Sequence, residues 1–251
     1  MTRPASILRA TALIAAGGLL LASAPPAGEP AAVPSATANG PATLGIAPLR
    51  VEIEGGSAGA TVRLTNSSSH ALPVQARLFS WTQENGEDVY APSNELVVSP
   101  SITSIPPGQT QIVRVLRKGA ASPGEKRYRL AVDQLPDPSL ARPGQALTRI
   151  RFTLPVFVDR EKAPPAAFTW RLANDRIELV NNGGATARVL DLQVIGQDGR
   201  LVPVERNALR YVLGNSTITW PLGNGCSLGT VRVTAQIDGQ AIDGVATSAC
   251  G

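Results

Sequence analysis

The fold is decided by residues 51–69, which read VEIEGGSAGATVRLTNSSS. Apolar and polar side chains alternate in Val51-Glu52-Ile53 and again in Thr61-Val62-Arg63-Leu64-Thr65. Each run ends in turn-forming residues, first Gly55-Gly56 and then Asn66-Ser67-Ser68-Ser69. A period of two places one face of a strand on a core and the other in water. The stretch therefore predicts two strands, each followed by a turn.

The same pattern continues to about residue 158. Further strands are predicted at Val74–Trp81, Glu95–Val98, Gln111–Leu116, Tyr128–Leu135 and Thr148–Val158. Asn85-Gly86 and Pro106-Pro107-Gly108 are predicted turns between them. Seven or eight short strands in about a hundred residues are typical of an immunoglobulin-like sandwich.

The alternation stops at Asp159–Pro165, where charged residues and Pro164-Pro165 indicate a boundary between domains. It resumes with predicted strands at Phe168–Leu172, Arg176–Val180, Arg188–Val194, Leu209–Leu213, Ser216–Pro221 and Thr230–Ile237. We therefore expect an all-β protein of two immunoglobulin-like β-sandwich domains, residues 44–160 and 166–251, with a cleft between them.

The N-terminus has the three parts of a secretory signal peptide. Arg3 and Arg9 supply a basic start, Ala10–Leu21 is apolar, and Ala22-Ser23-Ala24 offers small residues for cleavage. The apolar run is shorter than the ~20 residues that span a bilayer, which argues against a membrane anchor. We expect a signal peptide at residues 1–24 and an Ala/Pro-rich spacer at residues 25–43, with cleavage near residue 36 or 38 as the alternative.

The chain has two cysteines, Cys226 and Cys250, both near the C-terminus. In an exported protein an even number of cysteines favours a disulfide over free thiols. Two thiols and the one histidine, His70, do not supply the four ligands of a structural zinc site. We expect one disulfide in the second domain, and neither a metal nor a cofactor.

Two function classes are disfavoured by composition. The net charge of +4 comes from scattered Lys and Arg, with few aromatic residues for base stacking, so we do not expect nucleic-acid binding. His70 follows Ser67-Ser68-Ser69 in a predicted turn, without the strand–turn–helix of a serine nucleophile. The sequence therefore does not predict an enzyme.

A series of short motifs occurs in a specific order between Leu44 and about Pro165. These are Ile46–Val51, Leu64–Asn66, Val74–Arg77, Trp81–Gln83, Val98–Pro100, Ile105–Val115, Tyr128–Leu130 and Gln134–Pro136. In these motifs the sequence resembles the periplasmic pilus-assembly chaperones of the chaperone–usher pathway. Tyr128–Leu130 and Leu154–Phe157 are similar to the divergent branch that serves spore-coat-protein-U-like pili. The second domain resembles the family only in its strand pattern.

The resemblance implies a periplasmic chaperone that binds pilus subunits and delivers them to an outer-membrane usher. In such chaperones the last strand of the first domain completes the sheet of a subunit that lacks one strand. Here that strand carries Ile150, Phe152, Leu154 and Val156 on one face, and this apolar pattern makes them the expected donor residues. Alignment with the family would instead use Ala146, Thr148 and Ile150, a less apolar set, so we expect a shift of register towards Phe152 and Leu154. The alternative is an ordinary inner strand with one buried face. For the free chaperone, an unpaired apolar edge predicts either self-association or a mobile loop before the strand, at residues 136–145.

The resemblance further implies two basic side chains that hold the subunit's terminal carboxylate in the cleft. Arg50 falls at the first position, and a guanidinium can grip a carboxylate through two hydrogen bonds. Pro155 stands where other members carry a lysine, so Arg129 is the first substitute, followed by Arg151 and Arg149. Arg50 as a solvated strand residue is the alternative.

Two further readings remain open from the residues themselves. Arg160, in the break between the domains, can pair with Asp133 or Asp191 and so fix the angle between the domains, with a solvated linker arginine as the alternative. A secreted structural or adhesive protein of the same two-domain fold is the alternative to the chaperone function.

Overall fold

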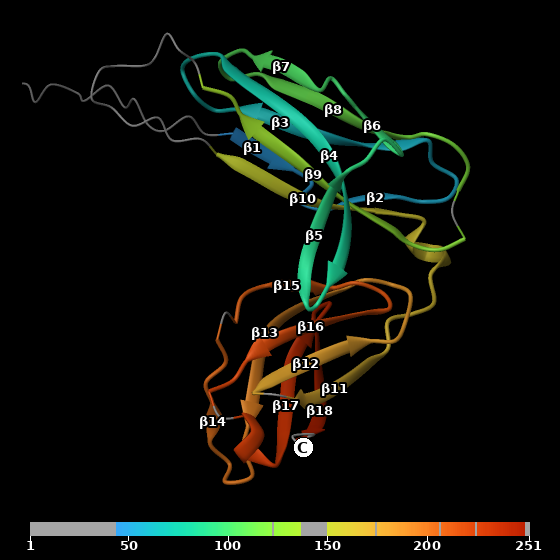
Figure 1. Cartoon of the computed structure of the whole chain (residues 1–251). Coiled ribbons are helices and arrows are strands. Elements are labelled where there is room, and N and C mark those ends of the chain that lie inside the picture. The colour runs from blue at the N-terminus through green and yellow to red at the C-terminus, as the bar shows by residue number, and fades with distance from the viewer. Residues whose placement is uncertain are drawn as a thin grey trace, which may run out of the picture. The chain divides into compact units, whose positions relative to one another are not determined.

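The computed structural model describes residues 44–121, 123–136, 150–173, 175–205, 207–223 and 225–248. These residues form two β-sandwiches of two sheets each, followed along the chain from blue to red in Figure 1. The all-β fold class with two immunoglobulin-like sandwiches is thereby confirmed. The predicted signal peptide and spacer lie outside the described residues, and the domain limits stay predictions.

The first sandwich packs a sheet of order β1-β3-β8-β6 on a sheet of order β2-β10-β9-β4-β5. The strands of the first sheet are β1 (Leu44–Ala47), β3 (Gly59–Asn66), β8 (Thr110–Arg117) and β6 (Leu96–Ser99). Those of the second are β2 (Val51–Ile53), β10 (Arg151–Val158), β9 (Lys126–Gln134), β4 (Leu72–Glu84) and β5 (Glu87–Pro92), with β7 (Ile102–Ile105) paired to β4. The core between them contains fully buried Val62, Leu64, Leu130 and Val156.

The motif Ile46–Val51 is divided between two sheets. β1 pairs with β3, whereas β2 pairs with β10, so the chain changes sheets at Pro48-Leu49-Arg50. Strands that switch sheets in this way make the corners of a sandwich. Arg50 therefore lies just before β2, beside the end of β10.

The second sandwich packs a sheet of order β11-β12-β16 on one of order β14-β13-β17-β18. The strands are β11 (Phe168–Ala173), β12 (Arg176–Asn181), β16 (Ser216–Pro221), β14 (Leu201–Val202), β13 (Ala187–Ile195), β17 (Thr230–Ile237) and β18 (Gln240–Thr247), with β15 (Arg210–Val212) paired to β13. Trp170 and Trp220 pack in its core with ring centroids 6.1 Å apart. Cys226 lies in the 3₁₀-helix η3 (Gly225–Leu228), and Cys250 lies outside the described residues, so their disulfide remains a prediction.

The β4–β5 hairpin extends to the second sandwich (Figure 1). Its turn is the predicted Asn85-Gly86, and both residues have the positive φ, 52° and 82°, that such hairpin turns need. The sequence did not predict β5, because every residue of that strand is exposed and no alternation marks it. β18 was missed for a similar reason, since most of its residues are exposed or half-buried.

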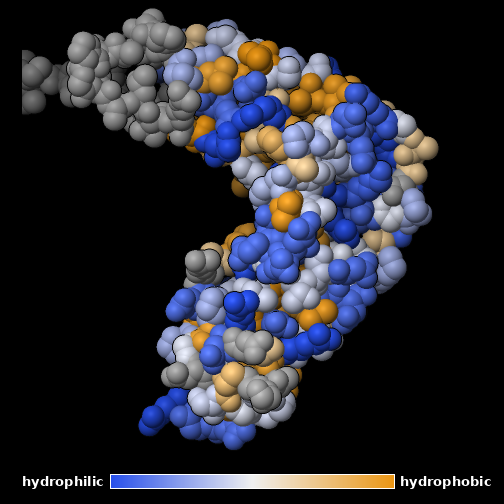
Figure 2. Space-filling model, viewed as in Figure 1, coloured by the Kyte–Doolittle hydropathy of each residue, from blue (hydrophilic) through white to orange (hydrophobic). Residues whose placement is uncertain are grey.

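The surface seen in Figure 2 is largely hydrophilic, with hydrophobic residues in small separate groups. One such group lies over β7 and β8. Ile102 of β7 and both Ile112 and Leu116 of β8 are exposed. Within the described residues, no helix has the length and apolar character to cross a bilayer.

Candidate functional site

Strand β10 has a partner along its whole length on one side only. It pairs with β9 from Arg151 to Val158, but with β2 only from Val156 to Val158. In the part of the chain that the structure describes, no strand pairs with the other edge of residues 151–155. The first half of β10 is therefore a free edge, as the strand-donor reading requires.

The hydrogen bonds between β9 and β10 determine which residues of β10 direct their backbone N–H and C=O groups to the free edge. Gln134 N donates to Ile150 O at 2.9 Å, which places Ile150 in a hydrogen-bonded pair with β9. Because such pairs alternate along antiparallel strands, Phe152 and Leu154 also direct their N–H and C=O groups to β9. Arg151 and Thr153 direct theirs to the free edge. Pro155 adds a carbonyl to that edge but no N–H.

Phe152, Leu154 and Val156 of the predicted donor set point to the core face, and the four residues differ in burial. Leu154 and Val156 are 3% and 0% exposed in the core of the first sandwich itself. For these two, the reading of β10 as a strand with one buried face matches the structure. Phe152 is half-buried and packs against the same core, and Ile150 is half-buried where β10 begins.

Arg50 lies at the other end of β10. Its guanidinium carbon is 4.7 Å from the centroid of the Phe157 ring, and its Nε donates to Glu52 Oε1 at 2.7 Å. About a third of its side chain, 34%, remains exposed. Arg50 is therefore held against the sheet but still offers donors to a ligand.

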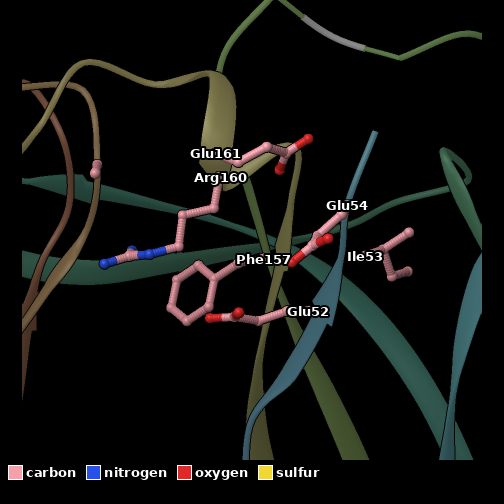
Figure 3. A pocket seen from close by; sticks show the side chains of 7 residues that line it. Glu52, Ile53, Glu54, Phe157, Arg160 and Glu161 are labelled. Atoms are coloured by element: carbon pink, nitrogen blue, oxygen red, sulfur yellow. The ribbon is translucent and has the colours of Figure 1, made fainter. Parts of the chain in front are cut away.

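Beside it lies a cavity of about 230 Å³. Figure 3 shows the side chains of Arg160, Phe157 and Glu52 extending to one side of β2 and β10, and Ile53 to the other. Ala185 of the second sandwich also lines the cavity, so it opens where the two sandwiches meet.

Arg129 is largely buried, with 11% of its side chain exposed. Its guanidinium carbon lies 3.6 Å from the centroid of Trp81 and 5.3 Å from that of Tyr211. Among the described residues, Arg129 Nη2 lies 3.8 Å from Asp88 Oδ2, and its Nε has no hydrogen-bond partner. Arg129 therefore makes cation–π contacts with both rings, and less of its guanidinium group is accessible to a ligand than that of Arg50.

The expected partners of Arg160 are wrong. Its Nη1 donates to Glu125 Oε2 at 2.8 Å and its Nη2 lies 3.7 Å from Asp238 Oδ2. Asp133 instead bonds Arg77 and Arg151. The reason is position along β9, because Glu125 precedes this strand beside the end of β10, whereas Asp133 lies opposite its start.

Glu125 links the two sandwiches, and the sequence analysis did not identify it. Its carboxylate is fully buried and accepts hydrogen bonds from Arg127, Arg160 and both the backbone N and the hydroxyl of Thr186. Gln83 forms a second link, donating to Tyr211 O at 2.7 Å and accepting from Leu213 N at 2.9 Å. Neither position carries a sequence signal, because a glutamate before a strand and a glutamine near a turn are ordinary surface residues.

No group of His, Cys, Asp and Glu side chains suited to hold a metal occurs among the residues that the structure describes. The site therefore consists of a free strand edge, apolar side chains at its start and arginines near its end. This arrangement can bind an extended polypeptide through its backbone and a carboxylate through Arg50.

Residues 43–162 match the family model described as "Pili and flagellar-assembly chaperone, PapD N-terminal domain". No curated protein matches the chain. A chain in the crystal structure of the CsuC–CsuE chaperone–tip adhesion subunit pre-assembly complex, from archaic chaperone–usher Csu pili of Acinetobacter baumannii, matches with TM-score 0.63 and 22% identity, covering 82% of this chain and 99% of that one.

Two further solved structures have the same fold. The E. coli chaperone DraB matches with TM-score 0.56 and 19% identity, covering 81% of this chain and 98% of its own. A chain of the Salmonella enterica SafA pilin–SafB chaperone complex matches with TM-score 0.58 and 16% identity, covering 81% and 96%. The family match covers the first sandwich, and the structural matches extend the likeness in fold over both.

Proposed function

Through residues 43–162 the chain belongs to the pili and flagellar-assembly chaperones, and we propose that it completes the sheet of an unfinished pilus subunit with the free edge of β10. Family membership favours this function over a structural or adhesive role. The observation that supports the mechanism is that β2 leaves residues 151–155 of β10 unpaired.

The free edge presents a short row of backbone hydrogen-bonding groups. Arg151 and Thr153 each present an N–H and a C=O, and Pro155 presents a C=O alone. Unpaired backbone groups of this kind are templates for a strand from another chain. The missing N–H of Pro155 and the start of β2 at Val51 together end the ladder, so the subunit strand stops near Pro155.

The donor side chains are those that the chaperone's own core does not already enclose. Ile150 and Phe152 lie where the core of the first sandwich ends, on the same face as buried Leu154 and Val156. A bound subunit would cover these two side chains and continue the apolar core across the new strand pair. Burying a large apolar side chain contributes about 1.5–3 kcal/mol.

Arg50 is the proposed anchor for the subunit's terminal carboxylate. It is one-third exposed and held over Phe157 at the C-terminal end of β10. With the carboxylate at this end, the subunit's last strand runs parallel to β10. Arg129 is the second residue of the proposed anchor. Its buried guanidinium is stacked on Trp81 and adds to the positive potential near Arg50.

The remaining parts of the proposal follow from the family and the sequence. The chaperone works in the periplasm after removal of residues 1–24, passes the subunit to an outer-membrane usher, and has a Cys226–Cys250 disulfide in its second domain. It acts without catalysis and without a cofactor. Without a subunit, the free edge of β10 favours self-association.

Periplasmic co-expression with each small secreted subunit encoded beside this chain tests the proposal. Affinity purification and size-exclusion chromatography would compare wild type with Phe152→Asp and Arg50→Glu. Ile112→Asp is the control for the added charge, because Ile112 is an exposed apolar residue on the other sheet.

We expect a one-to-one complex with wild type and with Ile112→Asp. We expect Phe152→Asp to abolish it and Arg50→Glu to reduce it at least tenfold, with both variants folded by circular dichroism. A complex that survives Phe152→Asp contradicts donation by β10, and one that tolerates Arg50→Glu contradicts the anchor alone.

A further inference from the structure

Asp133 is shared by two arginines at the start of the free edge. Arg77 Nη2, from β4, donates to Asp133 Oδ2 at 2.7 Å, and Arg151 Nε, from β10, donates to Oδ1. Arg151 and Asp133 lie directly opposite each other in the β9–β10 pair. The three side chains thus join three neighbouring strands on the outer face of the sheet, away from the core.

This cluster has more donors than acceptors. Arg77 and Arg151 are 43% and 59% exposed, whereas Asp133 is 12% exposed. One carboxylate faces two guanidinium groups, so the cluster carries a net positive charge beside the unpaired backbone of Arg151. Arg77 Nη1 and both Nη atoms of Arg151 have no partner among the described residues.

A cavity of about 320 Å³ adjoins the cluster. Arg77, Asp133 and Arg151 line it together with Gln134, Leu135 and Ile150. The two arginines suit this cavity to a ligand that brings a negative group.

A peptide strand with an acidic side chain fits both the free edge and the positive cluster. Its backbone pairs with Arg151 and Thr153, and its carboxylate meets the two arginines. The other charged groups of this outer face lie farther along the strands, where Arg129 faces Pro155 and Arg127 faces Phe157. Of the cations that the structure describes on this face, the two arginines at Asp133 are therefore the nearest to the start of the edge.

We propose that Arg77 and Arg151 bind an acidic side chain of the pilus subunit and so help to select it. The inference rests on the proposed function, which fixes the subunit's terminal carboxylate at Arg50 and its last strand parallel to β10. Since paired strands advance together at about 3.3 Å per residue, the acidic residue lies about four to six residues before the subunit's C-terminus.

Asp133 has the role of an internal competitor in this arrangement. In the free chaperone Asp133 accepts one hydrogen bond from each arginine. When the subunit binds, its carboxylate and that of Asp133 share the hydrogen-bond donors of both arginines. Removal of Asp133's charge should therefore strengthen subunit binding, whereas a purely structural role for the cluster requires that it weaken binding. This opposite sign separates the two roles.

The test uses the full chain and each small secreted subunit encoded beside it, with affinity measured by calorimetry at about 50 and 300 mM salt. The variants are Arg77→Gln/Arg151→Gln and Asp133→Asn. Arg63→Gln/Arg114→Gln is the matched control, because it removes the same charge from exposed positions on the opposite sheet.

We expect Arg77→Gln/Arg151→Gln to weaken binding about tenfold at low salt and to reduce its salt dependence, as a charge pair across an interface does. Asp133→Asn should tighten binding severalfold, and the control should change it less than twofold. A subunit in which the acidic residues four to six positions from the C-terminus are changed to amides should lose the same tenfold, with no change to the chaperone.

The inference is overturned if Arg77→Gln/Arg151→Gln binds like the control, or if Asp133→Asn weakens binding as much as the arginine pair does. The amide variants of the subunit decide the matter if a chaperone variant unfolds. Failure of the proposed function is distinct, because Phe152→Asp would then retain the subunit or wild type would bind none.

Discussion

The two halves of β10 show the same alternation of apolar and polar residues but differ in how many strands pair with them. Val156–Val158 lies between β2 and β9, with both backbone edges paired and Val156 fully buried. Residues 151–155 have β9 on one side and no described strand on the other. The first half can therefore accept a partner, while the second half belongs wholly to the fold. One strand serves both purposes because its neighbour β2 is only three residues long.

The same comparison applies to the charged residues at the two ends. Arg50 and Arg160 at the paired end contact Phe157 and are tied to carboxylates of the fold. At the free end, Arg77 and Arg151 share one carboxylate and keep donors in solvent. Arg160 near the paired half fixes the junction between the sandwiches, whereas Arg50 at the same end and the two arginines of the free half remain partly exposed to a partner.

The largest effect should come from a charge in the paired half. Val156→Asp places a carboxylate in a core position that is 0% exposed and should lower the free energy of unfolding by about 4 kcal/mol or more. Urea denaturation followed by circular dichroism measures it. Thr153→Asp, on the exposed face of the free half, should cost less than about 0.5 kcal/mol, and equal losses would contradict the division of β10.

Removal of Glu125's carboxylate should give the next largest effect. Glu125→Ala leaves Arg127 and Arg160 without their shared acceptor at the junction that follows the paired half. Since both arginines keep some exposure, we expect a loss of about 2–3 kcal/mol, less than for a fully buried pair. Thermal unfolding measures it, and Glu161→Ala, an exposed acid in the same junction, is the control.

Thr153→Pro should remove subunit binding without loss of fold. The N–H of Thr153 points to the free edge, so proline there breaks no bond to β9. We expect affinity for the subunit to fall about ten- to a hundredfold, the effect of one lost hydrogen bond with its unpaired acceptor, with a nearly unchanged melting temperature. Thr153→Val keeps the N–H and should bind normally, whereas normal binding by Thr153→Pro would contradict the assigned edge.

The smallest effect concerns pH at the free half. Partial burial raises the pKa of Asp133, but hydrogen bonds from Arg151 and Arg77 outweigh it and hold this pKa below its usual range. A depressed carboxyl pKa stabilises the fold above the unfolded value near 3.9, and this contribution is lost as pH falls through the folded pKa. The difference in unfolding free energy between wild type and Asp133→Asn should be constant from about pH 7 to 5 and vanish at lower pH. NMR titration of the carboxyl should show its pKa rising in Arg151→Gln.

Most strands could be predicted because each has one face on a core. The exceptions show the limit of that signal, since β5 is exposed on all sides and β14 has two residues. Arg50 was identified through a motif, and the structure places it at the end of β10. The partners of Arg160 were predicted wrongly, because the distance along β9 that separates Glu125 from Asp133 becomes apparent only when strand pairing is known.

The sequence by itself determined the all-β class, the division into two sandwiches and the apolar face of β10. The alternation predicts which side chains are buried, because burial is driven by apolar side chains and their order can be read from the sequence. Only the tertiary structure decided that β2 stops short of residues 151–155, that Arg129 is stacked on Trp81 and that Glu125 joins the sandwiches. A free edge consists of unpaired backbone groups, and almost every residue carries the same backbone groups. Its position therefore cannot be read from the sequence and depends on where the neighbouring strand ends.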